Sequence, residues 1–187
     1  MNYIILGAGA IGSFYGALLS KKHDVLLVGR KKHVDAVNKE GLKITGKING
    51  AFKVAADTEI RTIKENTLIL LCTKVFDNEQ AINSIKDKLR EDTVIVCVQN
   101  GVGAEDIVKN LVPNKVLRAV INQAVSYQEP GLIKTPFIGY FRAEKDDSLL
   151  ELINTLKELK IDASLEDNIK IDLWKKMVIN CILNPMT

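Results

Sequence analysis

The stretch Tyr3-Ile4-Ile5-Leu6-Gly7-Ala8-Gly9-Ala10-Ile11-Gly12 decides the fold class, because it joins a short apolar strand to a glycine-rich turn. The glycines have the spacing G-x-G-x-x-G, and residues 11–22 carry apolar side chains on one face of a predicted helix. In this context Gly7 permits a tight turn, Gly9 leaves room for a pyrophosphate, and Gly12 lets the helix pack on the strand. Free N–H groups at the helix start favour an anion. We predict a dinucleotide site formed by Gly7, Ala8, Gly9, Ala10, Ile11 and Gly12; the alternative is a glycine-rich turn that binds nothing.

Short apolar segments alternate with amphipathic ones over the first two-thirds of the chain. Apolar runs lie at residues 3–6, 25–28, 68–72, 94–98 and 116–121. Helical segments are expected between them, including one over 79–89, and residues 42–44 and 52–54 predict a hairpin. This alternation is typical of a parallel sheet with helices on both faces. The predicted fold is therefore α/β, a Rossmann-like, doubly wound and mostly parallel sheet.

The last third of the chain has a different pattern. Residues 124–141 alternate and contain prolines and glycines, which predicts strands added antiparallel at the edge of the sheet. A helix is expected over 148–159 and a linker over 163–168. A last helix is expected from near Glu166 to Asn184.

Composition and charge exclude several classes of protein. The 187 residues are 47% hydrophobic and 26% charged, which excludes low-complexity disorder, and the apolar runs are too short to span a membrane. The net charge of +3 comes from lysines scattered among acidic residues, so we expect an anionic small-molecule ligand and no nucleic acid. The three cysteines are far apart and have no metal-ligand spacing. Met1 leads straight into the first strand, so we expect no signal peptide, no metal, no membrane and a reducing, cytoplasmic location.

The residues after the second apolar run indicate whether the chain binds NAD or NADP(H). An NAD site usually has an acidic residue there, whereas this chain has Val28-Gly29-Arg30-Lys31-Lys32. A guanidinium can bind a 2′-phosphate through two hydrogen bonds, and a carboxylate would repel it. We therefore predict NADP(H), with Arg30 as the main contact and Lys31 or Lys32 assisting. The alternative is a solvated basic loop.

Three further segments carry a family resemblance. They are Leu71-Cys72-Thr73-Lys74, Val98-Gln99-Asn100-Gly101-Val102-Gly103, and the motif Trp174-x-Lys176-x3-Asn180-x3-Asn184-Pro185. With the glycine turn and Arg30, they make the chain resemble the ketopantoate reductase (2-dehydropantoate 2-reductase) family. The resemblance implies NADPH-dependent reduction of a 2-keto acid in the pantothenate and coenzyme A pathway. It makes Lys176 the general acid, places Lys74 and Asn100 at the cofactor and substrate site, and assigns substrate binding to Asn100, Asn180 and Asn184.

The resemblance also implies a division of the chain. Residues 1–165 would be the NADP-binding domain, and 166–187 would begin an all-helical catalytic domain that supplies further substrate contacts. These 187 residues alone are therefore expected to hold an incomplete site and to have little or no reductase activity.

The chemistry of the last helix can be considered without the family. Lys176, Asn180 and Asn184 recur every four residues and form one polar stripe, which suits a carboxylate and a carbonyl. An ammonium group placed there can stabilise and protonate an alkoxide. The alternatives are a solvated helix face, a non-catalytic NADP-binding module or fragment, and a related reductase for another 2-keto acid.

The other faces of the last helix are apolar and predict packing. Their side chains are Trp174, Met177, Val178, Cys181 and Ile182. Leaving several of them exposed is unfavourable, so we expect the helix to fold back, to pair with a second copy, or to fray. A homodimer is favoured because a two-fold partner covers the same stripe on both chains. The two histidines, His23 and His33, are flanked by lysines and are expected to be exposed.

Overall fold

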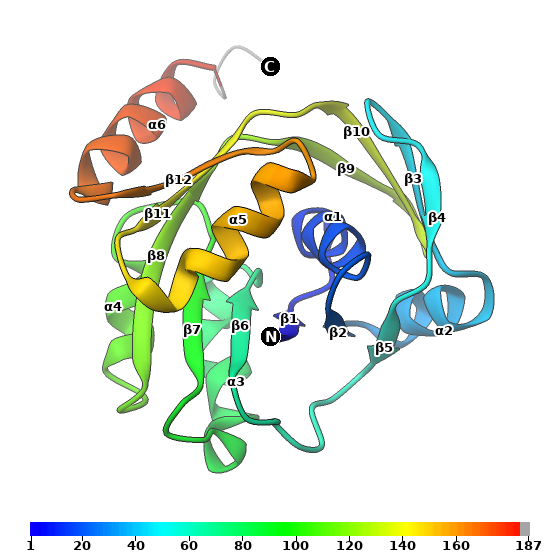
Figure 1. Ribbon diagram of the computed structural model, residues 1–187, viewed down its shortest axis with the longest axis horizontal. Helices are drawn as coiled ribbons and strands as arrows, with labels where there is room; N and C mark the ends of the chain where they lie inside the picture. Colours follow the sequence, from blue (N-terminus) through cyan, green and yellow to red (C-terminus); the bar gives the residue numbers. More distant parts are fainter. Residues whose placement is uncertain (184–187) are drawn as a thin grey trace.

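The computed structural model describes residues 1–183, and its centre is one eight-stranded sheet (Figure 1). The strand order is β12-β11-β8-β7-β6-β1-β2-β5. The bounds are β1 Asn2–Leu6, β2 Asp24–Val28, β5 Ala55–Asp57, β6 Thr67–Leu71, β7 Val94–Cys97, β8 Lys115–Ile121, β11 Tyr140–Glu144 and β12 Asp162–Glu166. All neighbours from β5 to β8 pair in parallel, which confirms the doubly wound, mostly parallel sheet.

Helices cover both faces of this sheet. They are α1 Ala10–Leu19, α2 Lys31–Glu40, α3 Asn78–Asn83, α4 Ala104–Lys109, α5 Leu150–Glu158 and α6 Ile169–Leu183, with single 3₁₀ turns η1 Val75–Asp77, η2 Lys86–Lys88 and η3 Asp147–Leu149. Ile5 of β1 faces the core formed with α1 and α5, and its neighbour Ile4 faces the core formed with α3 and α4. The alternation of side chains along a strand therefore requires a helix layer on each side. No helix in residues 1–183 combines the length and apolar character needed to cross a bilayer.

A second, four-stranded sheet has the order β4-β3-β10-β9, with β3 Leu42–Gly46, β4 Gly50–Phe52, β9 Ala124–Glu129 and β10 Leu132–Phe137. The predicted hairpin is confirmed as the antiparallel pair β3–β4. The prediction for 124–141 is only partly right, since β11 alone pairs antiparallel with β8 at the main edge. Strand β10 instead pairs in parallel with β3 and antiparallel with β9 (Figure 1). Ile133 of β10 and Ile44 of β3 are register partners, and both are buried.

Two other predicted elements differ in the structure. The linker expected over 163–168 is wrong, because β12 pairs in parallel with β11 and buries Ala163. The helix expected over 79–89 stops at Asn83, where Ser84 Oγ donates to the Ala81 carbonyl at 2.7 Å. Such local bonds compete with the helical ladder.

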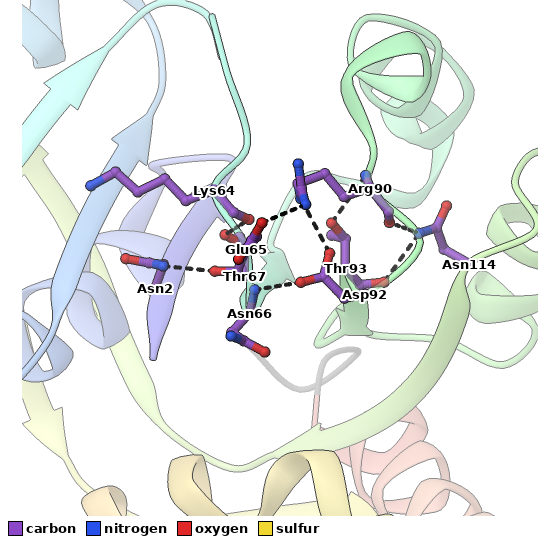
Figure 2. Close-up of polar contacts among 9 residues, drawn as sticks. All are labelled: Asn2, Lys64, Glu65, Asn66, Thr67, Arg90, Asp92, Thr93 and Asn114. Atoms are coloured by element: carbon purple, nitrogen blue, oxygen red, sulfur yellow. Dashed lines mark hydrogen bonds and ion pairs between the residues drawn. The ribbon is translucent and has the colours of Figure 1, made fainter.

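A network of polar contacts ties together the loops at the amino ends of β6 and β7 (Figure 2). Asp92 accepts the backbone N–H of Asn66 at 2.6 Å, and this bond lowers the pKa of the Asp92 carboxyl. Arg90 lies 3.0 Å from Glu65 and 3.4 Å from Asp92, and Asn114 donates to the Arg90 carbonyl at 2.7 Å. These contacts hold the amino ends of the strands together, while the glycine turn lies at the carboxyl ends.

Candidate active site

The glycine turn combines two crowded positions with one open position. Gly7 has φ +106°, and a Cβ there would lie 2.7 Å from the Thr73 nitrogen. A Cβ at Gly12 would lie 2.2 Å from the Gly7 oxygen, so the helix start has no room for a side chain. A Cβ at Gly9 would meet nothing within 4 Å. Since α1 starts here with no acidic residue in its first turn, the open space fits an anionic phosphate group.

The other predicted residues of this turn have distinct places. The Ala8 N–H donates to the Val28 carbonyl at 2.8 Å, which fixes the turn to the end of β2. Ala10 is the first residue of α1, and Ile11 lines the large cleft described below.

Arg30 lies at the tip of β2, where it is exposed and precedes the first residue of α2. Burial raises the pKa of the Tyr127 hydroxyl, and the positive charge of Arg30 offsets part of this increase. Lys31 lies 3.1 Å from Asp35, so it already has a partner, and Lys32 is exposed. Arg30, Lys31 and Lys32 are all exposed at this tip, and their contacts with a 2′-phosphate stay a prediction.

A cleft of about 790 Å³ lies at the carboxyl ends of the strands. Its lining includes Ile11, Thr73, Lys74, Asn100, Gln123 and Lys176. Lys74, Asn100 and Lys176 come from three segments far apart in the sequence, and the fold brings them to one cavity. The cleft is large enough for the reactive end of a cofactor and a small substrate.

Lys176 and Asn100 are in direct contact across this cleft. Lys176 Nζ donates to Asn100 Oδ1 at 2.6 Å. Burial of the ammonium group and, as a smaller cause, the nearby charge of Arg118 together lower the pKa of Lys176 to about 8. A lysine with this pKa is largely protonated at neutral pH and is a better acid than an ordinary lysine.

Asn100 is held by a buried arginine that the sequence analysis missed. Arg118 is 2% exposed and lies on β8. Its Nη2 donates to the carbonyls of Gln99 and Gly101, the latter at 2.9 Å, and its Nη1 donates to Glu105 at 3.2 Å. The signal was available in the sequence, because Arg118 interrupts the apolar run Val116-Leu117-Arg118-Ala119-Val120-Ile121.

The remaining predicted site residues lie on α6 and after β6. Lys74 caps η1, is exposed, and has its Nζ 5.7 Å from the ring centroid of Phe76. Asn180 belongs to α6, but its side chain lies outside what the structure describes. Asn184 lies outside the described residues. Of the predicted polar stripe Lys176, Asn180 and Asn184, the structure therefore describes only the side chain of Lys176.

The prediction that the histidines are exposed is wrong. His33 is 2% exposed; its Nδ1 accepts the Gly131 N–H at 3.1 Å, and its Nε2 lies 3.0 Å from Ser13 Oγ. Since Nδ1 is an acceptor, Nε2 carries the proton and donates to Ser13. Burial lowers the pKa of His33, and the neutral ring ties α2 to α1 and to the β9–β10 turn. His23 is half-buried and contacts Thr155 at 2.8 Å.

One side of α6 packs on the main sheet, and another side is exposed. Ile169 and Leu173 pack against Val120 and Tyr140. The helix therefore folds back on the sheet. It packs there through Ile169 and Leu173, and some of the residues that were expected to pack are exposed. Trp174 and Val178 are 53% and 54% exposed, Cys181 is exposed and Met177 is half-buried. The structure does not describe the side chain of Ile182.

A family model described as "Ketopantoate reductase PanE/ApbA" matches residues 3–148. The chain belongs to this family. The match includes the glycine turn, Arg30, Lys74, Asn100 and Arg118. It ends before α6, so Lys176 lies beyond the part matched by this model.

Longer relatives align with the whole chain. The 2-dehydropantoate 2-reductase of Pyrococcus horikoshii is 35% identical over 192 aligned positions, which cover 100% of this chain and 63% of the relative. The same enzyme of Archaeoglobus fulgidus is 31% identical over 98% of this chain and 62% of the relative. The chain thus spans somewhat less than two-thirds of the length of these relatives.

Solved structures share the fold. A PanE/ApbA family ketopantoate reductase from Ralstonia eutropha superposes with a TM-score of 0.90 at 28% identity, covering 97% of this chain and 61% of that one. A D-mandelate dehydrogenase, solved with NADH and anilino(oxo)acetate, superposes with a TM-score of 0.80 at 28% identity, covering 96% and 61%. The D-mandelate dehydrogenase structure thus contains a nicotinamide cofactor.

Proposed function

We propose that the protein reduces ketopantoate, a 2-keto acid, to pantoate with NADPH, in the pantothenate and coenzyme A pathway. The observation that carries the proposal is the contact between Lys176 Nζ and Asn100 Oδ1 in the cleft beside the glycine turn. A protonated lysine with a lowered pKa, fixed by an amide oxygen, is suited to give a proton to a carbonyl oxygen.

The proposed mechanism divides the work among a few residues. The open position at Gly9 and the start of α1 would hold the pyrophosphate of NADPH, and the bound cofactor would supply a hydride. Lys176 Nζ would stabilise the charge that develops on the substrate carbonyl oxygen and donate its proton there, which gives the alcohol. Asn100 would orient the ammonium group, and Lys74 would face the negative charges of the bound ligands. Asn180 and Asn184 stay proposed substrate contacts.

The cofactor preference gives the first prediction. Arg30→Asp is expected to weaken NADPH binding by roughly 10- to 100-fold, because it replaces a charge-assisted contact with repulsion. NADH binding should hold or improve, because NADH has no 2′-phosphate and an NAD site usually has an acidic residue at this position. The preference for NADPH should therefore be erased or reversed. Calorimetric titration of both cofactors measures this, with Lys31→Asp as a matched control whose effect should be smaller. Equal affinity of the unchanged protein for NADPH and NADH would contradict the assignment.

The reaction itself is tested by turnover. We expect NADPH oxidation at 340 nm when the complete protein is mixed with ketopantoate, and much slower oxidation with pyruvate. The relatives extend beyond the aligned part, and the family resemblance implies further substrate contacts there. These 187 residues alone are therefore expected to bind NADPH with little turnover. Absence of turnover by the complete protein with any 2-keto acid would favour a non-catalytic NADP-binding module.

A second candidate substrate class follows from one comparison. The structure of D-mandelate dehydrogenase with NADH is as similar in sequence as that of the Ralstonia eutropha reductase. A reductase of another 2-keto acid, such as 2-oxo-2-phenylacetate, is therefore the alternative. The ratio of kcat/KM values for this acid and ketopantoate separates the two candidates.

Two further proposals concern the organisation and location of the protein. We place the boundary of the NADP-binding domain at residue 165 and the start of the catalytic domain at 166; β12 ends at Glu166 and α6 begins at Ile169. We also propose a cytoplasmic location, supported by the free thiols Cys72, Cys97 and Cys181.

The exposed face of α6 gives the second prediction. Ile171, Trp174 and Val178 are each at least half exposed, and a two-fold partner would bury all three on both chains. Expressed alone, the 187 residues should form a dimer with about twice the 20.7 kDa mass of one chain, measured by light scattering at several concentrations. Trp174→Lys should give a monomer and Trp174→Phe a dimer. A strictly monomeric parent with a solvent-exposed indole fluorescence would refute the pairing.

A further inference from the structure

We infer that Arg118 is a positioning residue for the acid: it fixes the turn that carries Asn100 and sets the electrostatic environment of Lys176. This inference rests on the proposed function, since it assigns a task in the same site. Three observations support it: the placement of the Arg118 guanidinium, the contact between Asn100 and Lys176, and the charges around α6.

The first observation is a buried guanidinium that binds the chain on both sides of Asn100. Arg118 Nη2 donates to the carbonyl of Gln99 and, at 2.9 Å, to the carbonyl of Gly101. The residue between these carbonyls is therefore held by a rigid planar group inside the protein. Gly101 has φ +95°, which glycine adopts readily, so the bond from Arg118 to its carbonyl adds a constraint that the flexible glycine backbone lacks.

The second observation is that the held residue touches the acid. Asn100 is exposed and follows the end of β7, so the strand ladder does not fix it. Its Oδ1 nevertheless accepts from Lys176 Nζ at 2.6 Å. A displacement of about 1 Å in such a contact can cost roughly 100-fold in rate.

The third observation is charge. The ionisable groups on the strands that pack against α6 are Lys115 and Arg118 on β8 and Tyr140, Arg142 and Glu144 on β11. On α6 itself, Lys176 is accompanied by Lys170, Asp172, Lys175 and Cys181. Arg142 is paired with Asp162 at 2.6 Å. The negative charge of Asp172 is a smaller cause, after burial, of the raised pKa of Tyr140 and, after the bond to Asp162, of the raised pKa of Arg142. Arg118 is the charge that acts on Lys176, and it lowers the pKa of that ammonium group. Glu105, 3.2 Å from Nη1, offsets part of this positive charge.

The arrangement predicts opposite effects for two neighbouring substitutions. Arg118→Met removes the positive charge, so the pKa of Lys176 should rise above about 8, while burial, the larger cause, keeps it below the ordinary 10.5. Glu105→Gln keeps an acceptor for Nη1 but leaves the guanidinium uncompensated, so the pKa of Lys176 should fall below about 8. Arg118→Lys keeps the charge without the two-carbonyl contact; it should leave the pKa near 8 and lower kcat by roughly 10- to 100-fold.

The test uses the complete protein and two readouts. The pH dependence of kcat/KM gives the alkaline limb, and NMR of lysines labelled at Cε, assigned with Lys176→Arg, gives the pKa of Lys176 without turnover. Arg142→Met is the matched control, because it removes an arginine from the neighbouring strand and should leave both readouts unchanged. If Arg118→Met does not fold, Glu105→Gln and Arg118→Lys carry the test.

The outcomes separate the inference from the proposed function. A pKa of Lys176 that rises in Arg118→Met and falls in Glu105→Gln supports the inference, even if no 2-keto acid is reduced. Shifts in the same direction in both variants, or a pKa and a kcat unchanged in every folded Arg118 variant, would overturn it. If the parent protein does not reduce a 2-keto acid, the proposed function fails and the NMR result still decides the role of Arg118.

Discussion

Lys176→Ala is expected to lower kcat for ketopantoate reduction by about 10²- to 10⁴-fold, the range for loss of a positioned general acid. The proton would then have to come from water, which Asn100 cannot orient as it orients the ammonium group 2.6 Å away. The dissociation constant of NADPH should change by less than about threefold, because the pyrophosphate site lies at the glycine turn. Stopped-flow measurement of NADPH oxidation in a single turnover isolates the chemical step.

The matched control is Lys175→Ala. Lys175 is exposed and lies next to Lys176 on the same helix, so the change removes the same charge from α6 without touching the contact with Asn100. Its kcat should stay within about twofold of the parent, since surface substitutions seldom perturb a site. A similar loss in both variants would mean that net charge, and not proton donation, is what the helix supplies.

The acid assignment also fixes the sign of the pH dependence. Lys176 has a lowered pKa of about 8, and only its protonated form can donate. The value of kcat/KM should therefore be level below pH 8 and fall tenfold per pH unit above it. Lys176→Ala should lose this alkaline limb, and a limb that persists in this variant would assign it to another group.

Gly12→Ala is expected to have the largest effect on stability. The added Cβ would lie 2.2 Å from the Gly7 oxygen and 2.9 Å from Cγ2 of Ile5, so the start of α1 must move away from β1. Overpacking of this kind costs about 3 kcal/mol, and more where the contact is with backbone. In a chain of this length that corresponds to a fall in Tm of roughly 6–12 °C, measured by thermal denaturation.

Gly9→Ala is the matched variant in the same turn. Its Cβ would meet nothing within 4 Å, so the free energy of unfolding should change by less than about 1 kcal/mol. The methyl group would occupy the space proposed for the pyrophosphate, so NADPH affinity should fall by about tenfold or more. Unchanged affinity in a normally folded Gly9→Ala protein would contradict the proposed phosphate position.

The sequence by itself determined the parts of the fold that depend on local patterns. An apolar run, a glycine turn and an amphipathic helix can each be recognised within ten or so residues, and their repetition predicts a parallel sheet with its ligand at the carboxyl ends of the strands. For the same reason the local pattern is enough to place Lys74 and Asn100, each at the end of an apolar run, at the carboxyl ends of the strands. The family resemblance, and not spacing, implied that Lys176 belongs to the same site, and only the structure shows its contact with Asn100.

The tertiary structure alone decided the features that depend on partners distant in sequence. The segments 124–137 and 162–166 alternate as any strand does, and only the packing of Ile133 beside Ile44 and of Ala163 on β11 assigns each to its sheet. His33 has lysines beside it in the sequence, yet Ser13 and Gly131 supply the two hydrogen bonds that allow its burial. Arg118 is the clearest case. A guanidinium can be buried only where acceptors surround it, and these acceptors come from residues 13–19 positions earlier, on a different strand end and helix.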